Sequence, residues 1–177
     1  MMKGTLLILV AGLALAGCSS KPPADTTTYR SPASGLRTDL LSENMLETAD
    51  KTPEVIWLNA ARAFKYDHTI QYILELDYLS SEEHGFLEIP PGPTLTLTID
   101  GKENTFSGVG SGTNREKTQG GTVTERAFYT VERRLFEEIT QARKVRVQIR
   151  GKNGTVDRWF TPVNFDRFYK FVEKFDS

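Results

Sequence analysis

The sequence predicts an α+β fold, with a mainly antiparallel sheet of about five to seven strands and two amphipathic helices packed on it. The first observation is that apolar residues occupy every second position in several separate segments, as in strands with one buried face. The second is that Asp100-Gly101 and Asn153-Gly154 lie between such segments and are typical of tight hairpin turns. The third is that two late segments, 132–142 and 161–175, place apolar residues at helical spacing.

The composition limits the class of protein. The chain has 177 residues, of which 38% are hydrophobic and 25% charged, as in ordinary globular proteins rather than disordered or multi-span membrane chains. A net charge of −1 lacks the basic excess that is typical of nucleic-acid-binding domains. The single Cys forbids an intramolecular disulfide, and only two His are present. We therefore expect no nucleic acid, no metal and no cofactor.

Residues 1–17 have the pattern of a secretory signal. Lys3 supplies a positive start, and an uncharged apolar run follows at 5–16. Twelve residues make a helix of about 18 Å, which is too short for a hydrocarbon core of about 30 Å. The run therefore indicates export rather than a membrane-spanning helix.

The end of this segment, Leu15-Ala16-Gly17-Cys18, resembles the lipobox of bacterial lipoprotein precursors. The resemblance implies that the chain is cut before Cys18, which then carries a thioether-linked diacylglycerol and an acylated amino group. Two or more acyl chains anchor a protein stably in a bilayer. Ser19, where the family's inner-membrane retention signal has Asp, implies the periplasmic face of the outer membrane in a Gram-negative host.

Residues 18–50 are predicted to tether the folded domain to the lipid. The stretch 19–34 is rich in Ser, Thr and Pro and is expected to be disordered. In 38–48, Leu41, Met45 and Leu46 lie at near-helical spacing, which favours a short docked helix; the alternative is further linker. The α+β domain is then expected at 51–177.

The elements of this domain follow in order. Segment 52–64 contains alanines that favour a helix, but Ile56, Leu58 and Ala60 alternate, and we prefer a strand. Further alternation predicts strands at 70–78, 86–89, 94–99, 103–106, 125–131, 144–150 and 155–160. The last helix is expected to begin at Thr161-Pro162, a capping residue followed by a proline at the first helical position.

The final hairpin carries the predicted binding patch. A two-residue turn pairs residues whose numbers sum to 307 and a four-residue turn those that sum to 305, and both leave the same residues on each face. The face opposite the apolar one carries Arg146, Gln148, Arg150, Asp157 and Trp159. With the four-residue turn Arg146 opposes Trp159, so the guanidinium can lie on the indole. Because exposed Trp and Arg are frequent at interface hot spots, we interpret this face as a partner-binding patch. The alternative is that another element buries Trp159.

Other segments show no catalytic motif. The Gly-rich stretch 107–121 precedes a predicted strand and contains no Gly-Lys-Ser/Thr, so we interpret it as a long hairpin loop and a candidate partner-binding segment rather than a phosphate site. His68 and His84 lie in predicted turns. Glu75 and Asp77 alternate with leucines on the outward face of a strand, where the simplest expectation is that water surrounds them. No serine, histidine or lysine motif of a known hydrolase type occurs.

These observations predict a lipid-anchored module of the cell envelope that acts by binding, without an enzyme's active site. The globular part resembles the small envelope lipoproteins of unknown function, and our first hypothesis is an accessory protein that docks on a protein partner. An alternative is capture of a small ligand or a cell-wall glycan in a pocket lined by Trp57, Tyr72 or Tyr78. A further alternative is a carboxylate-dependent hydrolase, which a pocket with convergent acids would favour.

Overall fold

The computed structural model describes residues 26–48 and 52–176, where ten strands form two antiparallel sheets beside two helices. Sheet A contains, in spatial order, β1 (Thr26–Arg30), β2 (Arg37–Leu41), β3 (Val55–Phe64), β4 (Ile70–Ser81), β8 (Thr122–Val131) and β7 (Arg115–Lys117). Sheet B contains β10 (Thr155–Trp159), β9 (Val145–Arg150), β5 (Gly92–Ile99) and β6 (Lys102–Gly108). The helices are α1 (Arg133–Gln141) and α2 (Pro162–Asp176). The predicted α+β class is thus confirmed, with the strands divided between two sheets. The predicted signal segment and Cys18 lie outside the described residues.

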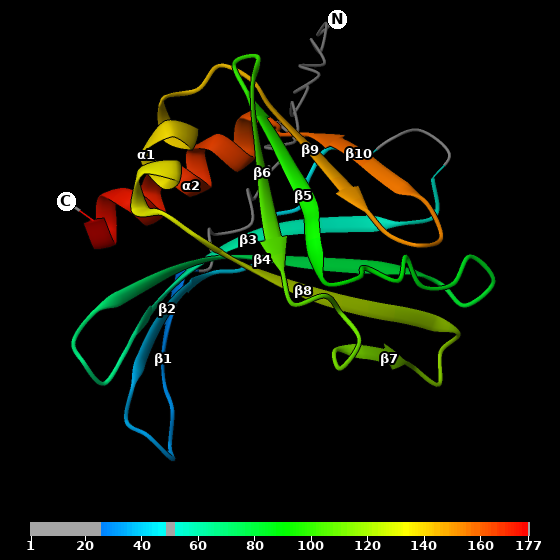
Figure 1. Cartoon of the computed structure of the whole chain (residues 1–177), viewed down its shortest axis with the longest axis horizontal. Helices are drawn as coiled ribbons and strands as arrows, with labels where there is room; N and C mark the ends of the chain where they lie inside the picture. The colour runs from blue at the N-terminus through cyan, green and yellow to red at the C-terminus, as the bar shows by residue number, and fades with distance from the viewer. Residues whose placement is uncertain (1–25, 49–51, 177) are drawn as a thin grey trace, which may run out of the picture.

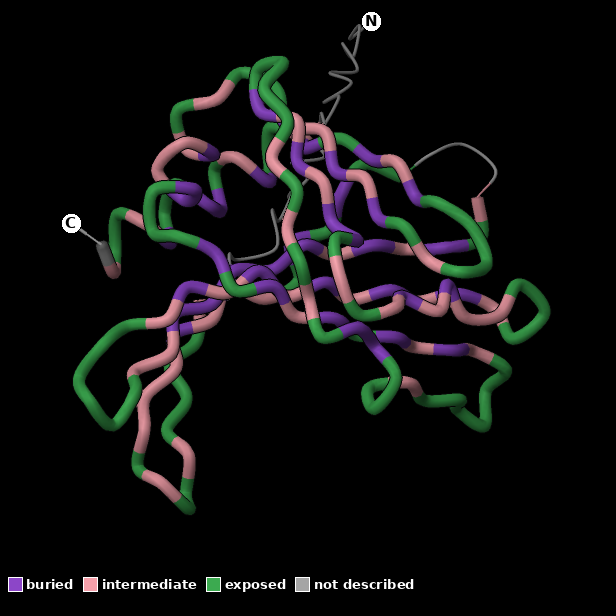
Figure 2. The backbone as a smooth tube through the Cα atoms, viewed as in Figure 1, coloured by how far each residue is buried: buried purple, intermediate pink, exposed green. Residues whose placement is uncertain are grey.

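Among residues 26–48 and 52–176, elements cover sheet A on one side only. Figure 1 shows sheet B and both helices on the same side of sheet A, while β1, β2 and β7 bend toward the opposite, uncovered side. Buried and half-buried residues alternate along β4 and β8, as Figure 2 shows, because every second side chain points into the space between the sheets. The core therefore lies on the inner face of sheet A, and its outer face is open.

Aromatic side chains lock the helices onto this core. The ring of Phe136 in α1 packs edge-on against Tyr72 of β4 at 5.4 Å between centroids, and against Phe168 and Phe171 of α2 at 5.9 and 6.1 Å. All three phenylalanines are buried. The predicted start of the last helix is confirmed at Pro162.

The two predicted hairpins are confirmed. Asp100 and Gly101 both have positive φ, 47° and 92°, as a two-residue turn between β5 and β6 requires. In the last hairpin Thr155 pairs with Arg150 and Trp159 with Arg146, so the register with a sum of 305 applies. Segment 52–64 is a strand, as we preferred.

The predicted helix at 38–48 is wrong, and sheet A includes residues 26–30 and 37–41, for which the sequence predicts a tether. Residues 26–30 and 37–41 pair as β1 and β2, and β2 also pairs with β3. The strand conformation places Asp39 on the inner face, where it is buried and accepts hydrogen bonds from Arg37 at 2.7 Å and Arg62 at 2.9 Å. The apolar spacing of this segment suggested a helix. The long-range ion pair between Asp39 and Arg62 instead stabilises it as a strand.

The predicted strand at 86–89 is also absent. Instead, the N–H groups of Glu88 and Ile89 donate to the buried carboxylate of Glu125, at 2.9 and 2.6 Å. The Gly-rich stretch is fastened at the same place, because the Ser111 hydroxyl contacts Glu125 and the Ile89 carbonyl. Gly110 there has φ +79° and lies so near the 90–91 backbone that a Cβ would meet Pro91 N at 2.8 Å. This stretch therefore packs on the body of the protein and includes β7.

Candidate functional site

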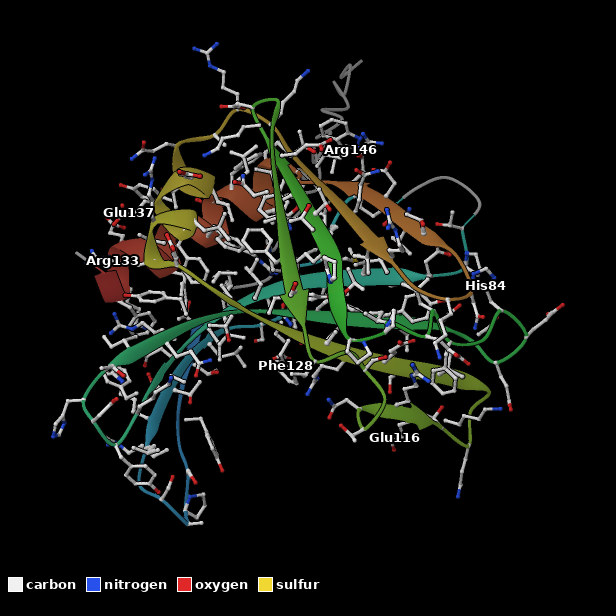
Figure 3. The ribbon with its side chains drawn as sticks, viewed as in Figure 1. His84, Glu116, Phe128, Arg133, Glu137 and Arg146 are labelled. Atoms are coloured by element: carbon white, nitrogen blue, oxygen red, sulfur yellow. The ribbon has the colours of Figure 1, made fainter. Side chains whose placement is uncertain are left out.

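Six side chains from three strands meet on the open outer face of sheet A. Outward positions alternate along each strand, and the register aligns Trp57 of β3, Asp77 of β4 and Arg126 of β8 in one row. The neighbouring row contains Asn59, Glu75 and Phe128. Figure 3 shows Phe128 pointing away from sheet B, toward the same side as Glu116 on β7.

The polar members of these rows hold one another in place. The guanidinium Nε of Arg126 donates to Asp77 Oδ1 and lies 3.1 Å from Glu75 Oε1. The amide of Asn59 donates to Asp77 Oδ2 at 2.9 Å. Both oxygens of Asp77 are thus engaged from neighbouring strands, so the arrangement does not depend on a ligand for its geometry.

The two carboxylates occupy different environments. The Glu75 side chain is only 13% exposed, and burial raises the pKa of this carboxyl, with a further rise from the nearby charge of Asp77. Burial alone lowers the pKa of Arg126, but the hydrogen bond to Asp77 and the charges of both carboxylates raise it above its usual value. The site therefore keeps a permanent cation beside an acid that protonates more readily than an ordinary Glu.

A cavity of about 710 Å³ is lined by five of these six residues, all but Phe128. Most of its lining residues have polar side chains, and acids outnumber bases among them. The acidic members are Glu43, Glu75, Asp77, Glu116 and Glu125, and the basic ones are Arg115 and Arg126. Trp57, Leu40 and Leu79 add apolar surface. Glu125 is not available to a ligand, because it is buried and its carboxylate already binds backbone N–H groups and Ser111.

A chain of buried amides ties the site to the C-terminal helix. Asn59 Oδ1 accepts from the N–H of Asn44 at 3.1 Å, and the Asn44 side chain accepts from Asn164 at 2.9 Å. Asn164 lies in the first turn of α2, where it also accepts from the N–H of Thr161 at 2.7 Å. The side chain that orients Asp77 is therefore itself fixed by the fold.

The patch predicted on the last hairpin is assembled on the outer face of sheet B. The guanidinium of Arg146 lies 6.0 Å from the Trp159 ring centroid and forms an ion pair with Asp157. The hydrogen bond from Arg146 lowers the pKa of Asp157. Gln148 donates to Asp157 at 3.4 Å, and Arg150 follows on the same face. Trp159 is 43% exposed, so it is not a core residue. Binding of a partner to this patch stays a prediction.

The three aromatic residues predicted to line a ligand pocket have different positions. Trp57 lines the cavity. Tyr78 borders it but is buried and donates to the Gly85 carbonyl, while Tyr72 belongs to the core. Glu75 and Asp77 do point outward, as expected, but Glu75 is largely covered rather than surrounded by water.

Asn59 and Arg126 were missed by the sequence analysis. Positions 57 and 59 lie on one face of β3, and positions 75 and 77 lie on one face of β4. That the two pairs share a face of the sheet follows only once β3 and β4 are known to be neighbours. Neither His lines the cavity: His68 lies in the β3–β4 turn, and His84 is 3.7 Å from Glu54. Within the described ranges no group of three or more His, Cys, Asp or Glu side chains is arranged to hold a metal ion.

Comparisons with known proteins assign no family. No protein-family model, no curated protein and no solved structure matches the chain. Of the two helices in residues 26–48 and 52–176, neither combines the length and the apolar character needed to cross a membrane.

Proposed function

We propose that this chain is a lipid-anchored binding module of the cell envelope, and that the outer face of sheet A binds a neutral glycan. The observation that carries the proposal is the fixed constellation of Asn59, Asp77 and Arg126 beside Trp57 in one cavity. This departs from our first sequence hypothesis, a protein-docking module, because the cavity offers convergent polar groups on rigid strands.

The chemistry of the cavity matches that of a sugar. Each sugar hydroxyl both donates and accepts hydrogen bonds, and carboxylate and guanidinium groups provide acceptors and donors in planar, paired form. The C–H face of a pyranose ring is apolar and can rest on an aromatic side chain, and the half-buried Trp57 lines the cavity. The balance of charge favours a neutral ligand over a phosphate, because two carboxyl groups, those of Glu75 and Asp77, flank the single guanidinium of Arg126.

The same geometry favours binding over hydrolysis. A glycosidase places its two carboxyl groups on either side of the scissile bond, roughly 5–10 Å apart. Glu75 and Asp77 are instead adjacent outward positions of one strand, and both contact the same nitrogen of Arg126. A sugar lying above them would meet both carboxyl groups from the same side.

Binding of linear oligosaccharides tests the proposal. Calorimetric titration with the tetrasaccharides of cellulose, chitin and starch offers neutral probes of different linkage. We expect at least one to bind, with Trp57→Ala weakening it about tenfold or more. Trp159→Ala, outside the cavity and on the outer face of sheet B, is the matched control and should bind as the wild type does. Equal binding by the Trp57 variant, or no binding of any of the three, would refute the proposal.

Lipid attachment rests on the lipobox resemblance alone. Cys18→Ser removes the thiol that would carry the diacylglycerol, so the variant should stay unprocessed and fail to take up labelled palmitate. Normal processing and normal sedimentation with membranes would contradict the anchored placement.

Docking of a protein partner on sheet B is a second candidate, favoured by the exposure of Trp159 next to the Arg146 guanidinium. Cross-linking in intact cells should then capture a partner with the wild type that Trp159→Ala does not capture, at unchanged thermal stability. A large loss of stability in the variant would instead give Trp159 a structural role.

A further inference from the structure

We infer that the ligand of this cavity is an internal segment of a linear glycan lying across the strands, rather than a single sugar or the end of a chain. The inference rests on the proposed function and names the form of its ligand.

The first argument is the length of the cavity. Its lining comes in spatial order from β2, β3, β4, β8 and β7. Five neighbouring strands about 4.8 Å apart extend over roughly 19 Å, which is several pyranose rings placed end to end. A single ring would leave most of a 710 Å³ cavity filled with water.

The second argument is that hydrogen-bonding groups recur along this whole length. Ser42 and Glu43 lie at the β2 end, Asp77 and Arg126 in the middle, and Asn114 and Glu116 at the β7 end. Between them Trp57 lines the cavity and provides apolar surface for one ring. A glycan can use all these positions because every one of its units carries hydroxyl groups.

The third argument is that the β7 end of the cavity is closed by a fixed segment of the protein. The N–H of Arg126 donates to the Asn114 carbonyl at 2.9 Å, and β7 pairs with β8 through Arg115 and Glu125. The Arg115 guanidinium also donates to Ser111 at 3.1 and 3.2 Å and lies 5.9 Å from the Phe86 ring centroid. The β7 arm is thus held where a ligand passing over β8 would meet it.

The direction of the cavity argues against an extended peptide. A peptide that adds to a sheet runs parallel to an edge strand and binds through its main chain. This cavity crosses the middle strands of sheet A, whose main-chain groups are already paired on both sides, so only side chains face the ligand. A polymer that hydrogen-bonds through hydroxyl groups suits that surface better.

A length series of one oligosaccharide, from monomer to hexamer, tests the inference with the full chain by calorimetry. We expect affinity to rise by about tenfold or more between monomer and tetramer and then to level off. Reduction of the terminal sugar of the hexamer to an open-chain alditol should leave its affinity unchanged, because the remaining intact rings still provide the internal segment that binds.

Two variants locate the ends of the site. Glu116→Ala should weaken binding of the tetramer but not of the dimer, whereas Trp57→Ala should weaken both. Glu83→Ala, an exposed acid outside the cavity, is the matched control for the loss of charge. Monomer binding as tight as tetramer binding, or loss of affinity on reduction of the terminal sugar of the hexamer, would overturn this inference and leave the proposed function standing. Absence of binding at every length would overturn both.

Discussion

A buried ion pair between the two sheets provides a quantitative test of how the structure is held together. Glu54, just before β3, accepts from Arg158 of β10 at 2.5 Å, and the two side chains are only 9% and 6% exposed. Glu54→Gln leaves the Arg158 guanidinium buried without a carboxylate, which typically costs about 3–5 kcal/mol. Its remaining contacts, to Thr52 and to the Asp157 carbonyl, favour the lower part of that range.

Urea unfolding followed by circular dichroism measures this cost. The matched control is Glu82→Gln, which breaks the ion pair with Lys117 at a similar separation of 2.8 Å, but with side chains 53% and 58% exposed. That pair should contribute no more than about 1 kcal/mol. Replacing both members of the buried pair, by Glu54→Leu with Arg158→Met, should recover most of the loss. The reasoning is refuted if Glu54→Gln costs no more than the exposed control.

Two further predictions concern stability. Burial raises the pKa of Glu75 in the folded state, so ionisation of this carboxyl opposes folding as the pH rises through that pKa. Glu75→Gln should therefore be more stable than the wild type at pH 7 and lose this advantage near pH 4. Urea unfolding midpoints at both pH values check the sign. Phe168→Ala, at a fully buried position, should cost about 3–5 kcal/mol, whereas the exposed neighbour Tyr169→Ala should stay within about 0.5 kcal/mol; similar midpoints for the two variants would contradict the packing described for α2.

Local patterns were sufficient for the parts of the fold that pair close in sequence. Along the last hairpin, every second residue from Val145 is buried, and any hairpin register that respects this parity places Val156 on the same face. The start of α2 is equally local, because Thr161 and Pro162 suit the first positions of a helix whatever surrounds them.

The errors arose where distant residues decide the conformation. The apolar spacing of Leu41 and Met45 is compatible with a helix. The strand is favoured instead because Asp39 accepts a hydrogen bond from Arg62, 23 positions away. Alternation at 86–89 suggested a strand, but two backbone N–H groups of this segment donate to the Glu125 carboxylate instead of to a neighbouring strand. Neither partner is visible in a window of local sequence.

The candidate site was predictable only in part for the same reason. The alternation of residues along the strand correctly predicts that Glu75 and Asp77 point outward. It predicts the same orientation for Arg126 once β8 is recognised as a strand. What parity cannot supply is the order of strands: β8 lies beside β4 although β5, β6 and β7 intervene in sequence. The cavity exists because of that order.

The amide chain behind the site leads to a last prediction, which separates support of the fold from support of the ligand. Asn59 is buried and uses both ends of its amide, one on the Asn44 N–H and one on Asp77. Asn59→Ala leaves the buried Asn44 N–H without this acceptor, a loss of about 1–3 kcal/mol in urea unfolding. Gln71→Ala breaks an amide hydrogen bond of 2.7 Å on the same face, but an exposed one, and should change stability by less than about 0.5 kcal/mol.

Asn59→Asp then distinguishes the two ends of the amide. It keeps an acceptor for the Asn44 N–H but brings a carboxylate against Asp77 in place of a donor. At pH 7 we expect this variant to bind oligosaccharide more weakly than the wild type, and to regain affinity as the pH is lowered and the crowded carboxyl groups take up a proton. If it binds at pH 7 as the wild type does, the orientation of Asp77 does not depend on Asn59, and the amide chain serves the fold alone.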